Sequence, residues 1–83
     1  MSVGTKELER TLPGDMVLQV FYPWRRRWGG KKQRRFLLLG ARPDDGLRPL
    51  AAHGDLVDGT VMLDRGVTLA PELVQQIEAA VRP

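Results

Sequence analysis

Residues 15–39 read DMVLQVFYPWRRRWGGKKQRRFLLL, and the rest of the chain is organised around this stretch. Its two ends, residues 16–22 and 36–39, are rich in valine, leucine and aromatic residues, which favours strands buried on both faces or nearly so. A proline and a glycine pair lie between them, so a long loop joining two antiparallel strands is predicted. We expect this hairpin to supply the core.

The centre of the stretch is strongly basic. Residues 23–36 hold seven of the chain's 13 lysines and arginines and no acidic residue, whereas the other six basic residues face ten acidic ones. The net charge of +3 therefore divides into a local +7 and −4 elsewhere. Both tryptophans, Trp24 and Trp28, lie in this basic segment. Such a patch predicts contact with an anionic partner.

The residue types of the patch favour nucleic acid as that partner. Arginine binds phosphate through a planar fork, and tryptophan offers a face on which a base can stack. We expect a non-catalytic nucleic-acid-binding protein, with RNA and DNA both open. The predicted contacts are Trp24, Arg25, Arg26, Arg27, Trp28, Lys31, Lys32, Arg34 and Arg35.

Three other interpretations of the patch stay open. A phage- or plasmid-encoded module or inhibitor could use it to bind an acidic protein surface. The charged loop could also be a solvated loop without a ligand. Finally, either tryptophan could fold back to cover the open end of a barrel.

Size and composition limit the class of protein. The 83 residues fit one small domain, and 42% hydrophobic and 28% charged residues are typical of a globular chain. The absence of cysteine excludes a disulfide framework, thiolate metal ligation and a cysteine nucleophile. The first ten residues lack the apolar run of a signal peptide, and no run approaches the ~20 residues of a membrane span. We expect a cytoplasmic protein without membrane contact.

The regions flanking the central stretch are less regular. Residues 1–12 show no hydrophobic period, so we expect a flexible lead-in before a single domain over residues 13–83. Residues 47–53 favour a short edge strand, because Pro49 cannot lie in the centre of a sheet. This edge and the small core also make a homodimer a hypothesis, in which two basic hairpins could line one groove.

The C-terminal third carries two clear signals. Asp58-Gly59 stands between the apolar runs 56–57 and 60–63, a pattern typical of a tight hairpin. Residues 70–82 have apolar residues at helical spacing and Pro71 in the first turn, which predicts a helix. The whole chain therefore indicates four or five short strands followed by one helix.

Catalytic chemistry has little support in the sequence. His53 is the single histidine and stands two residues from Asp55, so a general-base pair can be written, although a lone loop histidine is more often a surface residue. Ser2 is the single serine, so no nucleophile triad can be assembled. The aspartates lie in turns, and no glycine-rich phosphate motif is present. We expect no catalytic residue, no metal and no cofactor.

Several short motifs resemble PemK/MazF-type toxin endoribonucleases of toxin–antitoxin systems. They are LPGDMVL at 12–18, FYP at 21–23, KQRRFLLL at 32–39 and LAPEL at 69–73. The resemblance implies an SH3-like barrel and places Arg34 on the family's active-site arginine, while Arg35 stands where the family has proline. It makes a ribonuclease toxin a further hypothesis. A second resemblance, of Lys32-x-Arg34 to the basic hairpin of pleckstrin-homology domains, implies inositol-phosphate binding.

With this resemblance, the predicted fold class is α+β. It consists of a small, mostly antiparallel SH3-like β-barrel of four to five short strands with one C-terminal helix.

Overall fold

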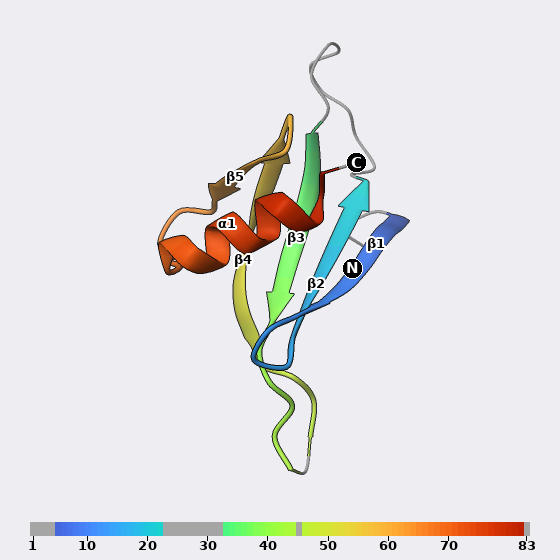
Figure 1. Cartoon of the computed structure of the whole chain (residues 1–83), viewed down its shortest axis with the longest axis vertical. Helices are drawn as coiled ribbons and strands as arrows, with labels where there is room; N and C mark the ends of the chain where they lie inside the picture. The colour runs from blue at the N-terminus through green and yellow to red at the C-terminus, as the bar shows by residue number, and fades with distance from the viewer. Residues whose placement is uncertain (1–4, 23–32, 45, 83) are drawn as a thin grey trace.

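A computed structural model describes residues 5–22, 33–44 and 46–82 of the chain. They form a five-stranded antiparallel sheet with a helix across one face (Figure 1). The elements are β1 (Thr5–Leu12), β2 (Met16–Tyr22), β3 (Gln33–Leu39), β4 (Leu50–Val57), β5 (Thr60–Leu63) and α1 (Pro71–Ala80). Strand order in the sheet follows the chain, β1-β2-β3-β4-β5. The predicted α+β class and C-terminal helix are confirmed.

The predicted central hairpin is β2 paired with β3. Leu18 lies opposite Leu38, and Val20 lies opposite Phe36. Because side chains alternate between the two faces of a strand, these four residues share one face, and all four are fully buried. The helix adds Ile77 to this core. The apolar ends of the opening stretch therefore do supply the core.

The opposite face of β2 and β3 is more open than predicted. Val17, Gln19, Phe21 and Leu37 alternate with the core residues and are only half-buried. α1 packs on the core face, so it leaves this second face uncovered in the described part of the chain (Figure 1). We call it the open face, and it corrects the expectation of strands buried on both sides.

β4 and β5 form the hairpin that the Asp58-Gly59 signal predicts. Asp58 and Gly59 have φ angles of 53° and 81°, the left-handed pair that a two-residue hairpin turn requires. α1 is tied to the outer edge of β5, because the N–H of Val61 donates a hydrogen bond of 2.9 Å to Oε2 of Glu78. The helix thus contacts the sheet through both its apolar stripe and one carboxylate.

The N-terminal segment differs from the prediction. Instead of a flexible lead-in over residues 1–12, residues 5–12 form β1, which pairs antiparallel with β2 around an irregularity between Lys6 and Leu8. Half of its side chains are charged and exposed, which is usual for a protected edge strand. Only Leu8 and Leu12 pack against the core, so β1 leaves little trace in the hydrophobic pattern.

The edge strand expected over residues 47–53 is also wrong. β4 begins at Leu50, after Pro49, and lies between β3 and β5. Pro49 therefore lies outside the strand and does not have to donate a backbone hydrogen bond to the sheet. Its carbonyl accepts a 2.7 Å hydrogen bond from the N–H of Gly40. The edges of the described sheet are β1 and β5, and no backbone pairing between those two strands closes it into a barrel.

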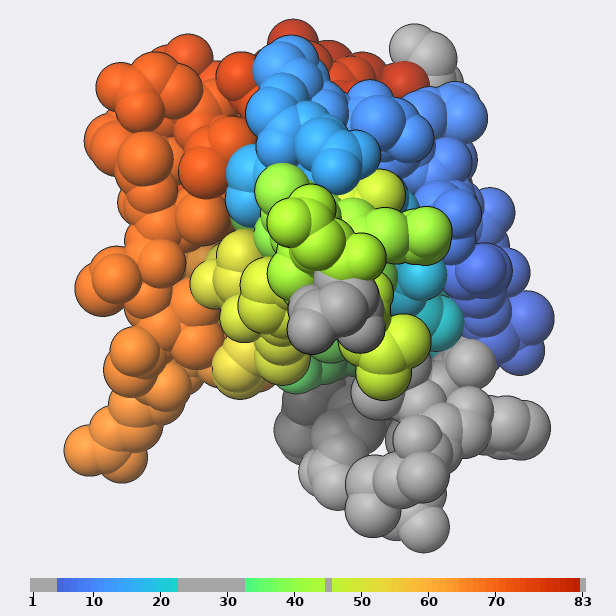
Figure 2. Space-filling view, turned by 90° about the horizontal axis from the view of Figure 1, so that it is seen from below, coloured from blue at the N-terminus to red at the C-terminus, as the bar shows by residue number. Residues whose placement is uncertain are grey.

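Loop 40–49 joins β3 to β4 at the end of the sheet opposite Tyr22 and Gln33. Seen from that end, it occupies the centre of the surface, with β1 on one side and the region of β5 and α1 on the other (Figure 2). Within the described ranges, no helix has the length and apolar character to cross a membrane.

Gly54→Ala is expected to destabilise the fold by about 1–3 kcal/mol, measured by urea unfolding. Gly54 lies in β4 between Phe36 and Leu63. A Cβ there would overlap the carbonyl oxygen of Met62 and lie 2.9 Å from the Cα of Leu63 and 3.0 Å from Cε2 of Phe36. Two of these three atoms belong to backbone, so the sheet itself would have to move.

Gly46→Ala is the matched control. A Cβ at Gly46 would meet only Cγ of Pro43, at 4.0 Å, so stability should change by less than about 0.5 kcal/mol. Equal stability of the two alanine variants would contradict the tight packing assigned to Gly54.

Candidate nucleic-acid interface

The structure describes two of the predicted nucleic-acid contacts, Arg34 and Arg35, both near the start of β3. The others lie outside the described residues. They are Trp24, Arg25, Arg26, Arg27, Trp28, Lys31 and Lys32.

The strands do define where the other contacts are attached. β2 ends at Tyr22 and β3 begins at Gln33, and the two strands are adjacent and antiparallel. Residues 23–32, which we call the basic connection, therefore leave and re-enter the sheet at the same end. They hold five lysines and arginines and no acidic residue.

Arg34 is engaged within the fold. Its Nη1 donates to Oε1 of Glu7 at 2.6 Å, a contact that joins β3 to β1 across the intervening β2. Both side chains are partly shielded from water. A phosphate at Arg34 would therefore compete with a carboxylate already in place.

Arg35 is paired still more fully. Its guanidinium donates to both carboxylate oxygens of Asp64, at 2.9 and 2.7 Å, and to Oδ1 of Asp55 at 3.0 Å. The fork on Asp64 is a bidentate arrangement, which is among the stronger protein ion pairs. The hydrogen bonds from Arg35, followed by the contact with His53, lower the pKa of Asp64 to about 2. The bond to Asp64 is in turn the main cause that raises the pKa of Arg35.

His53 completes this group on the open face. It lies in β4 and not in a loop, and its Nδ1 is within hydrogen-bond distance of Oδ2 of Asp64. The predicted partner was Asp55, which instead bonds Arg35. We call these four residues the His53 cluster. With Nδ1 bonded to Asp64, Nε2 is the ring nitrogen left for a further hydrogen bond.

The described residues around the His53 cluster do not build a complete catalytic or metal site. Among the described residues, His53 bonds the carboxylate of Asp64 and makes no hydrogen bond to a serine or threonine hydroxyl. In the ranges that the structure covers, no group of three or more histidines, cysteines and acids could hold a metal ion. The cluster is thus an ion-paired network on the sheet, with one imidazole edge available.

The described part of the chain carries little net charge. The described residues contain eight lysines and arginines and nine acids, so they are close to neutral. The basic connection contributes +5 without any acid. The excess positive charge of the protein therefore belongs to residues 23–32, and Arg34 and Arg35 are balanced by acids of the sheet.

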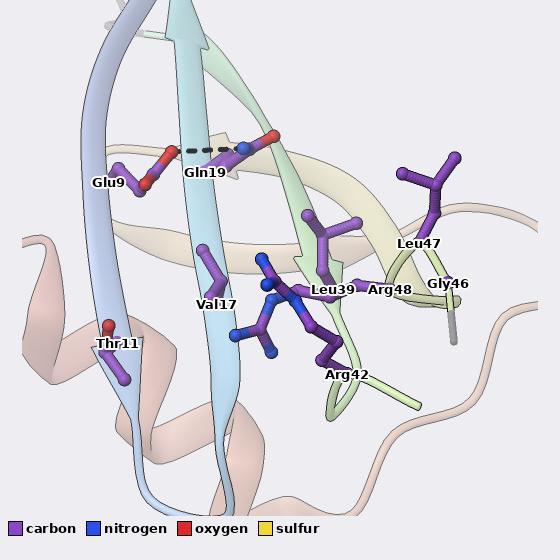
Figure 3. A pocket seen from close by; sticks show the side chains of 9 residues that line it. All are labelled: Glu9, Thr11, Val17, Gln19, Leu39, Arg42, Gly46, Leu47 and Arg48. Carbon is purple, nitrogen blue, oxygen red and sulfur yellow. Dashed lines mark hydrogen bonds between the residues drawn. The ribbon is translucent and has the colours of Figure 1, made fainter. Parts of the chain in front are cut away.

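A second polar site lies at the other end of the open face, between loop 40–49, β1 and β2 (Figure 3). It is a pocket of about 700 Å³. Its lining residues are Glu9, Thr11, Val17, Gln19, Leu39, Arg42, Gly46, Leu47 and Arg48. We call it the Arg42 pocket, and sequence reasoning missed it because loop 40–49 shows only turn signals.

Arg48 lines this pocket and is held in place by Asp15 of the turn between β1 and β2. Arg48 donates to the backbone oxygens of Asp15 and Gly40 and to Oδ1 of Asp15 at 3.2 Å. The N–H of Arg42 donates to Oδ2 of Asp15 at 3.3 Å. The Arg48 hydrogen bond, followed by the backbone bond from Arg42, lowers the pKa of Asp15. The loop is thereby tied to the turn between β1 and β2.

Comparison of the chain with protein-family models, with curated proteins and with solved structures found no match.

Asp64→Asn is expected to lower stability by about 1 kcal/mol at pH 7, a modest value because the cluster is open to water. The pKa of Asp64 lies below its ordinary value of 3.8, so ionised Asp64 stabilises the fold above about pH 4. That contribution should disappear as the pH falls through about 2. Urea unfolding of wild type and variant between pH 7 and about 2 measures the difference.

Asp58→Asn is the control, because Asp58 is exposed and has no ion pair within the described chain. Asparagine also tolerates its positive φ. A stability gap for Asp64→Asn that stays constant from neutral to acid pH would refute the charge-based role of Asp64.

Proposed function

We propose that this protein binds nucleic acid through the basic connection and does not catalyse a reaction on it. The observation that carries the proposal is the separation of charge. Five of the nine acids in the described residues form ion pairs with cations outside residues 23–32, as Glu7 does with Arg34, whereas residues 23–32 hold five cations and no acid in their sequence. A run of positive charge of this density in the sequence favours a polyanion.

The composition of the basic connection supports nucleic acid over other polyanions. Three consecutive arginines can each bind a phosphate through two N–H groups, and Trp24 and Trp28 flank them with surfaces for base stacking. The pairing of Arg34 and Arg35 with acids leads us to assign them to holding β3 in place. The phosphate contacts are then assigned to Arg25, Arg26, Arg27, Lys31 and Lys32.

For the fold, we propose the SH3-like class of small barrels. Five short antiparallel strands joined in sequence order and one closing helix support this assignment. Kinship with PemK/MazF-type toxins remains a proposal that rests on the short motifs around Asp15, Arg34 and Pro71.

Removing the arginine triplet should weaken binding and flatten its salt dependence. We expect wild type to bind single-stranded RNA or DNA more weakly at about 200 mM than at about 50 mM salt. Replacing Arg25, Arg26 and Arg27 by alanine should reduce the slope of log K against log salt by about 2, which corresponds to three phosphate contacts on a single strand. Fluorescence anisotropy of a labelled oligonucleotide measures both quantities.

A triple variant at Arg10, Arg65 and Arg82 is the matched control. It removes the same total charge from exposed positions outside the basic connection. Binding that is absent in wild type, insensitive to salt, or equally reduced in both triple variants would overturn the proposal. Retention of an acidic protein after nuclease treatment, without nucleic-acid binding, would favour the protein-interaction alternative instead.

The ribonuclease hypothesis makes a different prediction. RNA should stay intact during long incubation if the protein only binds it. Cleavage that disappears in Arg34→Ala would favour the toxin-like alternative. Glu7→Gln removes the charge of the Arg34 partner and keeps Arg34 itself, so it controls for the loss of the ion pair.

A further inference from the structure

Two arginines of loop 40–49 reach toward the Arg42 pocket, beside Val17 of β2 and Leu39 of β3 (Figure 3). The two arginines differ in how many hydrogen bonds their guanidinium groups make with the described residues. Arg48 donates to three acceptors of the fold, so its hydrogen-bonding capacity is largely used. Arg42 engages only its backbone N–H, and within the described residues its guanidinium has no hydrogen bond or ion pair. Arg42 therefore presents a whole planar fork to the pocket.

The acids around the pocket do not neutralise Arg42. Asp15 is shared between Arg48 and the backbone of Arg42. Glu9 accepts from Lys6 at 2.9 Å and from Gln19 at 3.1 Å, and these bonds lower the pKa of Glu9 and keep it ionised and occupied. One positive charge is left over in the pocket lining, which suits an anionic group such as phosphate.

The rest of the lining suits the parts of a nucleotide other than phosphate. Val17 and Leu39 supply apolar surface, and Thr11 and Gln19 supply polar groups that can hydrogen-bond a sugar or a base edge. A volume of about 700 Å³ falls in the range of ligand pockets and exceeds what a lone anion needs. These features favour a single strand, because in a duplex the bases are stacked away from such a surface.

β2 links the pocket to the basic connection. Val17 and Gln19 line the pocket, and Phe21 is the next residue on the same face toward Tyr22, where the basic connection starts. Val17 and Phe21 are four residues apart, or roughly 13 Å along the strand. Phe21 offers a ring on which a base could stack between the two sites. Asp55 and Asp64 lie beyond β3 on this face and would repel phosphate from that side.

We infer that the Arg42 pocket is a second phosphate-binding site for the same strand of nucleic acid. The strand would run from the basic connection over the open face of β2 to Arg42. This inference rests on the proposed function, since it concerns the path of the ligand that the basic connection binds.

The test compares a short and a long ligand. Labelled single-stranded oligonucleotides of about 4 and about 16 nucleotides are titrated against wild type, Arg42→Ala and Arg65→Ala. Arg42→Ala should weaken binding of the longer oligonucleotide roughly tenfold and lower its salt slope by about 0.7, and should leave the shorter one unchanged. Arg65→Ala, an exposed arginine away from the pocket, should change neither.

Amide chemical shifts provide an independent readout of the path. The longer oligonucleotide should shift the backbone amides of Val17 and Gln19, and the shorter one should not. Equal affinities of Arg42→Ala and Arg65→Ala for the longer oligonucleotide would overturn this inference and leave the proposed function standing. Wild type that binds neither oligonucleotide would overturn both.

Discussion

The antiparallel pairing of β2 with β3 is the interaction on which the fold depends. It places Leu18, Val20, Phe36 and Leu38 on one face, and every other element extends or covers this pair. β1 attaches to β2, β4 attaches to β3, and α1 closes the apolar face. The two strands that supply four of the buried core residues are therefore also the strands to which the basic connection is attached.

The elements that the sequence predicts well are those with local signals. Two apolar runs, the Asp58-Gly59 turn and Pro71 before a helical period each act over a few residues, and each prediction is confirmed. β1 and the interior position of β4 could not be found in this way. Half of the β1 side chains are charged and only Leu8 and Leu12 pack against the core, and Gly54 interrupts the apolar pattern of β4 because β5 passes so close to it.

In the candidate site, the ion-pair partners of the arginines could likewise not be predicted from the sequence. Counted along the sequence, Arg34 and Arg35 belong to a stretch without acids, yet in space their partners come from β1, from β4 and from the residue after β5. Arg35 and Asp64 are 29 residues apart, and only the register of three strands brings them together. The expectation of phosphate binding therefore applies to residues 23–32 and not to Arg34 and Arg35. The Arg42 pocket has no sequence signal of its own, since its parts come from β1, β2, β3 and loop 40–49.

The hydrogen bond from Val61 to Glu78 has a consequence for how copies of the protein meet. An outer strand with free N–H groups is a template on which another chain can extend the sheet. Here the side chain of Glu78 accepts a hydrogen bond from one such N–H, that of Val61 on the four-residue β5. The other outer strand, β1, carries charged residues. Growth of the sheet from copy to copy, the first step toward a fibril, is thus hindered at both margins. The hindrance at β5 depends on the side chain of Glu78, so the helix protects one margin of the sheet as well as covering its core.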